Sequence, residues 1–178
     1  MLKVLQNPKT QKYLEFKNYI LHSDHFPWYY KLRATPNINV EKGYIDVDYF
    51  THTFLNRPEK KGYPISYSDF TEIVVEICKE IMDFNNISLV TLLRLNANFL
   101  NPFFKTLNTL PHFDHDYKHK NMLIYLTGSG GNTIVEGEVH EPQEDDVIIF
   151  QGKHYAQTPI SERRVVLVVT FIDRETVN

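Results

Sequence analysis

The chain has 178 residues, 42% of them hydrophobic, which suits one domain with a sizeable core and leaves little room for a second. The net charge is -3, so a large electrostatic surface for nucleic acid is not indicated, although small local contacts with nucleic acid stay open. The single cysteine excludes an internal disulfide. No segment approaches the ~18 apolar residues of a membrane span, and no signal peptide is apparent. We therefore expect one soluble, cytoplasmic domain over residues 1–178, with no membrane partner.

Apolar residues at helical spacing predict a first helix near the N-terminus. Tyr13, Phe16 and Ile20 form an imperfect apolar stripe within residues 8–22. Pro27 disfavours helix at the residue before it, so the helix must end before that point. A strand is expected to follow.

A longer helix is predicted after a strand that ends near Leu55. The strand runs into a polar loop that contains Pro58, Gly62 and Pro64. A serine, at position 66 or 68, would then cap a helix that ends near the sequence DFNN. The apolar residues of this helix lie at helical spacing: Phe70, Ile73, Val74, Ile77 and Ile81.

After Asn86 the hydrophobic period becomes that of β-strands. The segment SLVTLLRLNANFL alternates an apolar face with a largely polar one that carries Arg94, Asn96 and Asn98, and this polar face either is solvated or lines a pocket. The β-like segments NMLIYLTG, NTIVEG, DDVIIFQG and RRVVLVVTFID follow without an intervening helical pattern. Because parallel strands need crossover helices, we expect an antiparallel sandwich or barrel over residues 88–174, after a helical and mixed part over residues 1–87.

A histidine and a carboxylate two residues apart stand at the start of one of these β segments, in the sequence HFDHD. Alternate residues of a strand point to the same side, so His112 and Asp114 would share one face. His154 follows the segment DDVIIF, which an antiparallel fold can return to the first. Two histidines and one carboxylate leave three coordination positions open on a metal, the arrangement of non-heme Fe(II) sites.

Two other readings of this polar cluster stay open. A metal-dependent hydrolase would use residues 112–116 around Zn²⁺ or Mn²⁺ with a metal-activated water, but this leaves His154 unexplained. A non-catalytic jelly roll that binds a small acid or a protein would not need all three ligands. For His115, Asp116 and His119, in the charged sequence HDYKHK, we expect a solvated loop rather than metal ligation, with contacts to substrate as the alternative.

Adjacent arginines begin the last strong β segment. A buried guanidinium in a Val-rich strand needs an anion, and a carboxylate suits its forked geometry. Alternation places one arginine inside and the other in solvent. The ten-residue offset from His154 favours Arg164 as the inward residue, sharing its face with Val166 and Val168, and leaves Arg163 outside.

The motifs HFD, NMLIYLTGSGGNTIV and EDDVIIFQGKHYAQTPISERRVVLVVTF together resemble the Fe(II)- and 2-oxoglutarate-dependent dioxygenase superfamily, and within it the prolyl-4-hydroxylase-like members, over residues 89–172. The segments FPWYY and LLRLNANFL are similar to segments of oxygenases encoded by marine tailed phages. The resemblance implies an α+β fold, in which a double-stranded β-helix, or jelly roll, has N-terminal helices packed on one face.

The resemblance also implies roles for residues and cofactors. The three predicted metal ligands would be the catalytic residues, and Tyr125 would bind the C5 carboxylate of 2-oxoglutarate beside Arg164 or, if the offset differs by one, Arg163. The cofactors would be Fe(II) and the co-substrate 2-oxoglutarate, with O2 as the second co-substrate and ascorbate as an accessory reductant. The reaction would be hydroxylation with release of succinate and CO2. A prolyl or other protein residue, a nucleobase and a free metabolite all stay open as substrate.

Overall fold

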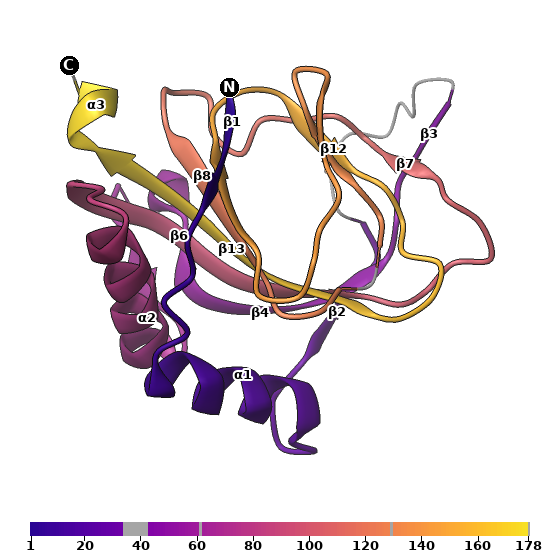
Figure 1. Cartoon of the computed structure of the whole chain (residues 1–178), viewed down its shortest axis with the longest axis horizontal. Helices are drawn as coiled ribbons and strands as arrows, with labels where there is room; N and C mark the ends of the chain where they lie inside the picture. Colours follow the sequence, from indigo (N-terminus) through magenta and orange to yellow (C-terminus); the bar gives the residue numbers. More distant parts are fainter. Residues whose placement is uncertain (34–42, 61, 129, 178) are drawn as a thin grey trace.

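The computed structural model describes residues 1–33, 43–60, 62–128 and 130–177, and most of its strands lie in two sheets (Figure 1). The large sheet has eight strands in the order β1-β11-β8-β13-β6-β4-β2, with β5 paired to β4. Its strands are β1 Leu2–Leu5, β2 Tyr29–Lys31, β4 Tyr49–Asn56, β5 Ile65–Ser66, β6 Leu89–Leu100, β8 Lys120–Tyr125, β11 Val147–Phe150 and β13 Arg164–Asp173.

A smaller sheet and a short strand pair complete the jelly roll. The small sheet has the order β10-β9-β12. Its strands are β9 Thr133–Val135, β10 Glu138–His140 and β12 His154–Ala156, and the pair is β3 Tyr44–Ile45 with β7 Asn108–Thr109. Among the described strands only β3 and β7 pair in parallel. The predicted antiparallel jelly roll is therefore confirmed.

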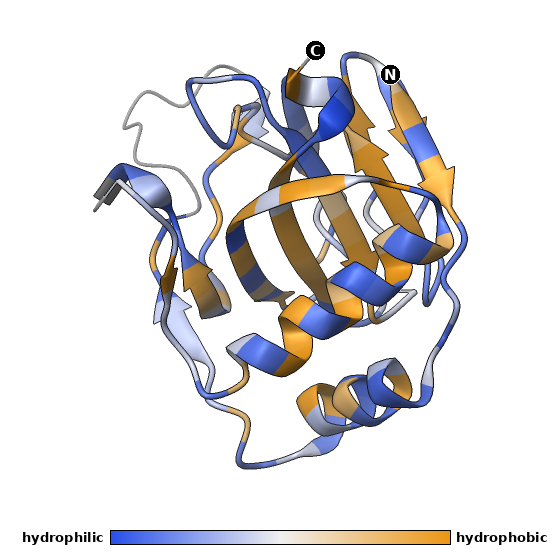
Figure 2. Cartoon of the chain, turned by 90° about the vertical axis from the view of Figure 1, so that its left-hand side faces the viewer, coloured by the Kyte–Doolittle hydropathy of each residue, from blue (hydrophilic) through white to orange (hydrophobic). Residues whose placement is uncertain are grey.

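The two predicted helices are present and cover one face of the large sheet (Figures 1 and 2). They are α1, Gln11–His22, and α2, Thr71–Phe84; the short helices η1, Pro58–Lys60, and α3, Arg174–Val177, lie elsewhere. Thr10 caps α1 by accepting a hydrogen bond from the backbone amide of Tyr13. Ser68 Oγ accepts from the backbone amide of Phe70, so a predicted serine precedes α2 without occupying the cap position itself. Within the described ranges, no helix has the length and apolar character needed to cross a membrane.

Both faces of the large sheet are buried, and alternation along each strand decides which core a residue enters. The outer face packs against α1 and α2, and the residues of β13 on this face are Val165, Leu167 and Val169. The inner face forms a second cluster with the small sheet. That cluster consists of Leu123, Tyr125, Val135, Ile148, Phe150 and Val166. Residues one position apart in β8 or β13 thus serve different cores.

The N-terminal half also supplies strands to the large sheet. β1 pairs antiparallel with β11, and β4 pairs with β6. The sheet therefore extends across the division expected near residue 87, and the N-terminal part does more than add helices. β4 matters for the site, because its C-terminal end leads into η1, which contributes to the cavity described below.

Candidate metal centre

The backbones of two histidines from distant parts of the chain are paired directly. His112 and His154 form an isolated antiparallel bridge, in which each amide nitrogen donates to the other residue's carbonyl oxygen, at 2.9 and 3.0 Å. Their imidazole centroids lie 4.6 Å apart. The bridge joins the segment before β8 to the start of β12, as an antiparallel return requires.

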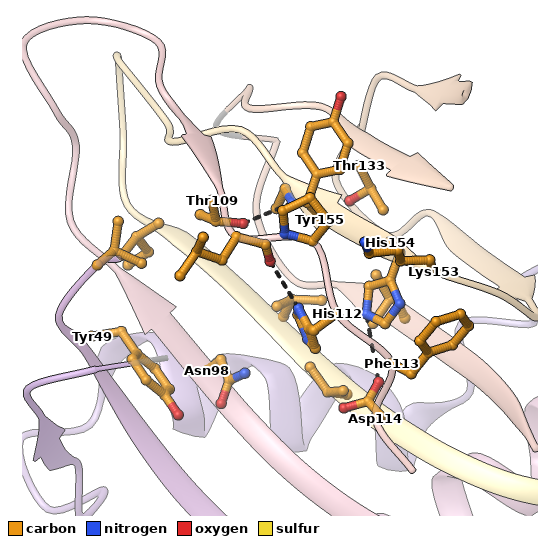
Figure 3. Close-up of a pocket in the computed structure, with 18 of the residues that line it drawn as sticks. Tyr49, Asn98, Thr109, His112, Phe113, Asp114, Thr133, Lys153, His154 and Tyr155 are labelled. Carbon is orange, nitrogen blue, oxygen red and sulfur yellow. Dashed lines mark hydrogen bonds and ion pairs between the residues drawn. The ribbon is translucent and has the colours of Figure 1, made fainter. Parts of the chain in front are cut away.

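Asp114 completes a cluster of three groups that can bind a metal. The ligand atoms of His112, Asp114 and His154 all lie within 4.8 Å of one another. The Nε2 atom of His154 is 3.5 Å from Oδ2 of Asp114 (Figure 3). The structure thus brings together the three residues that the sequence pattern placed on one face.

Both imidazoles are oriented in the same way by backbone carbonyls. Nδ1 of His112 is 3.1 Å from the carbonyl oxygen of Leu110, and Nδ1 of His154 is 3.2 Å from that of Gly152. A proton on Nδ1 donates to the carbonyl and leaves the Nε2 lone pair for a metal. Burial lowers the pKa of His154 to about 4, although the nearby Asp114 opposes the shift, so this imidazole is neutral at neutral pH.

The carboxylate of Asp114 has one paired and one unpaired oxygen. Oδ1 accepts a hydrogen bond from Nη1 of Arg94 at 2.7 Å, and Nη2 of Arg57 lies 3.5 Å away. Burial alone would raise the pKa of Asp114, but the charge of Arg94 and the other cationic groups around it outweigh burial and hold this pKa well below its usual range. Oδ2 is buried without a hydrogen-bond partner among the described residues. A buried anionic oxygen beside two imidazoles fits a divalent cation, and this donor set suits non-heme iron.

The cluster lies in the wall of a cavity of about 810 Å³ between the sheets. Arg164, at the start of β13, lines the same cavity and is only 9% exposed. Its Nη2 donates to Thr133 Oγ1 at 2.9 Å, while its Nε is buried without a partner among the described residues. Val166 and Val168 line the cavity on the same face of the strand. The guanidinium can therefore receive an anion inside the cavity.

The other two residues proposed for this end of the cavity are placed differently. Tyr125 is fully buried, with its ring under the Arg164 guanidinium at 5.4 Å, and its hydroxyl meets Thr133 Oγ1 at 2.7 Å. Tyr125 therefore reaches the cavity through Thr133. Arg163 points to the opposite face, where Nη2 donates to the carbonyl oxygen of Leu21 at 2.5 Å.

Several solved structures have a fold similar to that of this chain. An oxidoreductase of the 2OG-Fe(II) oxygenase family from Burkholderia pseudomallei has a TM-score of 0.62 and 16% identity, with 83% of this chain and 73% of that chain covered. A Trichoplax adhaerens prolyl hydroxylase in complex with a hypoxia inducible factor peptide fragment has a TM-score of 0.57 and 12% identity, covering 98% and 84%. The chain has the fold of the 2-oxoglutarate- and Fe(II)-dependent oxygenases.

Further comparisons show how much this oxygenase fold says about the reaction that a protein catalyses. The non-heme alpha ketoglutarate dependent epimerase SnoN from nogalamycin biosynthesis has a TM-score of 0.57 and 13% identity, covering 97% of this chain and 77% of that chain. No family model matches the sequence, and no curated protein is significantly similar to it. The fold thus accommodates more than one reaction type, and function has to be argued from the site.

The loop after Asp114 departs from the expectation that it is solvated. His115 and His119 are each only 5% exposed, whereas Asp116 is exposed as expected. His115 pairs through Nδ1 with Glu59 of η1 and through Nε2 with Thr170 Oγ1, the latter at 2.8 Å. The ring of His115 can be buried because Glu59 and Thr170, although distant in the sequence, supply hydrogen-bonding partners for its two nitrogens. Both ring nitrogens are engaged, so His115 does not extend the metal cluster as the hydrolase reading requires.

The polar face of β6 and one loop residue also contribute side chains to the cavity. The sequence left the role of the first open and did not indicate the second. Arg94 and Asn98 line the cavity, as one of the two readings of this face expects, while Asn96 is buried without lining it. Arg57 was not predicted: besides its ionic contact, its Nη1 donates to the carbonyl oxygen of Asp114 at 2.6 Å. It lies in a polar, Pro-containing loop far from the metal motif, and no local pattern indicates the contact.

Proposed function

We propose that this protein is an Fe(II)- and 2-oxoglutarate-dependent dioxygenase that hydroxylates its substrate. One observation carries the proposal: the buried Oδ2 of Asp114, which has no hydrogen-bond partner among the described residues, faces the paired imidazoles of His112 and His154. A facial set of two histidines and one carboxylate leaves three positions for a co-substrate and O2. The oxygenase fold supports the same conclusion.

The chain's own residues have separate tasks in this proposal. His112, Asp114 and His154 hold the iron, and the two backbone carbonyls behind the imidazoles keep Nε2 directed at it. Bound iron and 2-oxoglutarate would supply oxidative decarboxylation, in which one atom of O2 enters succinate, the other enters the substrate as a hydroxyl, and CO2 leaves. The apolar inner face around Val166 excludes bulk water from this chemistry.

Arg164 is the proposed anchor for the far carboxylate of 2-oxoglutarate. Its guanidinium is buried and lines the cavity, and its Nε has no hydrogen-bond partner in the part of the chain that the structure describes. A carboxylate accepts two parallel hydrogen bonds from such a group. Thr133, which already links Arg164 with Tyr125, adds a hydroxyl at the same place. The other end of the co-substrate would then meet the metal cluster across the same cavity.

The substrate class we propose is a protein residue of prolyl type, presented as a side chain at the cavity mouth. The cavity volume of about 810 Å³ lies in the upper part of the range of roughly 300–1000 Å³ that small-molecule sites occupy. It therefore has room for both the co-substrate and a substrate side chain. The mouth carries the exposed ring of Phe113, and a solved structure of the same fold is a prolyl hydroxylase bound to a peptide.

The proposal is tested in two steps. Anaerobic titration of the purified protein with Fe(II) and then 2-oxoglutarate should give one equivalent of each bound, the second detected by the visible charge-transfer absorption of the chelate. Air and ascorbate are then admitted with a library of proline-containing peptides, nucleosides and small metabolites, and succinate and hydroxylated products are measured by mass spectrometry. Absence of Fe(II)-dependent succinate formation with every substrate would reject the dioxygenase assignment. Turnover confined to nucleosides or metabolites would reject the prolyl substrate only.

A further inference from the structure

The two arginines around Asp114 do not face the position where the metal would sit. Arg94 Nη1 donates to Oδ1 at 2.7 Å, and Oδ1 is also the carboxylate oxygen that Arg57 Nη2 approaches, at 3.5 Å. Oδ2, the oxygen directed at His154, receives no hydrogen bond from the described residues. The two oxygens of one carboxylate are thus distinguished by their surroundings.

The backbone of Asp114 is held as well as its side chain. Arg57 Nη1 donates to the carbonyl oxygen of this residue at 2.6 Å. The next residue, His115, pairs with Glu59, which lies two positions after Arg57. The segment from Arg57 into η1 therefore contacts the metal loop at two successive residues, while Arg94 reaches it from β6. Rotation of the Asp114 carboxylate would break the short Arg94 contact.

We propose that Arg94, assisted by Arg57, is a positioning residue that keeps Asp114 monodentate by retaining Oδ1, so that only Oδ2 can bind the metal. This inference rests on the proposed function. A metal of this type takes six ligands, and two imidazoles with one carboxylate oxygen leave three positions. A bidentate Asp114 would leave two, one fewer than a chelating co-substrate and O2 need together. Arg94 therefore protects a coordination position.

The charge of Arg94 alone does not explain its placement. A cation beside the carboxylate reduces the negative charge available to a metal, so on electrostatic grounds its removal would strengthen metal binding. A role in positioning predicts a different outcome, a change in coordination number. The two readings are separated by a measurement of coordination that does not depend on turnover.

The experiment uses Co(II) in place of Fe(II), because its visible absorption reports the coordination number. The variants are Arg94→Met, which keeps an unbranched apolar stem without the donors of the guanidinium, Arg94→Lys and Arg57→Met. Arg174→Met is the matched control, since Arg174 is an exposed arginine on α3. Arg94→Met should retain Co(II) but show an altered spectrum, and its Kd for 2-oxoglutarate should rise at least about tenfold, the lower end of what outer contacts of metal ligands usually contribute.

Graded variants keep the test decisive. Arg94→Lys, with one donor to Oδ1, should lie between Arg94→Met and wild type, and Arg57→Met should show a smaller change, since its contact with Oδ1 is the longer one. If Arg94→Met does not fold, the other two variants carry the comparison. Spectra and 2-oxoglutarate affinities equal to those of the control in every folded variant would overturn the positioning role. Failure of the wild-type protein to bind Co(II) would instead reject the metal site of the proposed function.

Discussion

His112 and His154 are joined through both of their backbone hydrogen-bonding groups, although β8, β9, β10 and β11 separate them in the chain. A reciprocal backbone pair fixes the distance between two Cα atoms more firmly than side-chain contacts do. The spacing of the two imidazoles is therefore a property of the sheet and does not depend on a metal. Variants of the site residues should consequently keep the fold.

The first prediction concerns the metal ligands. His154→Ala removes one of three ligands and Asp114→Asn removes the negative charge of another, so each should abolish Fe(II)-dependent succinate formation while the far-ultraviolet circular dichroism stays that of the wild type. His25→Ala, a change of an exposed histidine outside the cavity, serves as the control. Full activity in either ligand variant would refute the assignment.

The second prediction separates the adjacent arginines. Arg164→Met should weaken 2-oxoglutarate binding by roughly 2–5 kcal/mol, because it leaves a carboxylate without its buried partner. Metal binding should persist, because Arg164 is not among the groups that contact Asp114. Arg163→Met should change the affinity little, since Arg163 lies on the other face of β13. Isothermal titration calorimetry of both variants provides the measurement, and a large loss confined to Arg163→Met would transfer the anchor to that residue.

The third prediction concerns His115, which is buried but is not proposed as a ligand. His115→Ala should bind metal as wild type does, yet its free energy of unfolding should fall by about 1–3 kcal/mol, because the fully buried hydroxyl of Thr170 loses its partner. Denaturant unfolding and Co(II) titration measure the two effects separately. Loss of metal comparable to that in His112→Ala would favour the hydrolase-type cluster.

The fourth prediction concerns the glycine-rich turn before β9. Gly131 has φ +81°, and a Cβ atom there would lie 2.5 Å from the carbonyl oxygen of Gln157. Gly131→Ala should therefore lower the free energy of unfolding by more than about 1 kcal/mol. Gly130 has a similar φ of +71° with nothing within 4 Å of the added atom, so Gly130→Ala isolates the cost of the backbone conformation. Equal losses in both variants would show that the close approach contributes nothing.

The fifth prediction is a pH dependence of stability that arises outside the cavity. His52 is buried among aromatic rings, its Nδ1 lies 2.7 Å from the Pro27 carbonyl oxygen and its Nε2 lies 2.8 Å from Ser68 Oγ. Burial lowers the pKa of His52 in the folded state, so the unfolded chain binds the proton more readily. The contribution of neutral His52 to the free energy of unfolding should be complete above a pH of about 6.5. It should be lost as the pH falls from there through the folded-state pKa.

The comparison variant for this pH dependence is His52→Gln, which retains hydrogen-bonding groups but does not titrate. Unfolding free energies of the two proteins, measured by denaturant titration across the acid range, should converge as the pH falls. A difference that is constant with pH would contradict the assignment to His52.

Local periodicity predicted the parts of the site that local geometry determines. The two-residue spacing of His112 and Asp114 predicted that they lie together, although the structure has only an isolated bridge at His112 and no strand there. The inward position of Arg164, at the start of β13, follows from strand alternation. Arg57 and the burial of His115 could not be predicted in this way. Their partners, Asp114 and Glu59, lie far away in the sequence, and the polar composition around each residue is as typical of solvent-exposed loops as of buried contacts.

The strand at the N-terminus illustrates the same limit for the fold. β1 has only four residues, two of them exposed, so its sequence carries little alternation. It becomes a strand because the edge of β11 supplies backbone partners over its whole length. Helices α1 and α2 were predictable because each carries its own apolar stripe, with Phe16 and Ile77 at their centres.

The alternation of the large sheet has a consequence for how such a protein diverges. Residues of β6 that face the helices, such as Leu95 and Ala97, maintain one core, whereas Arg94 and Asn98, on either side of this pair, face the cavity. Substitutions at the second set alter what the cavity accepts and leave the first set untouched. Selection for a new substrate can therefore act on every other residue of a strand while the architecture persists, and this is consistent with a shared fold at 12 to 16% identity.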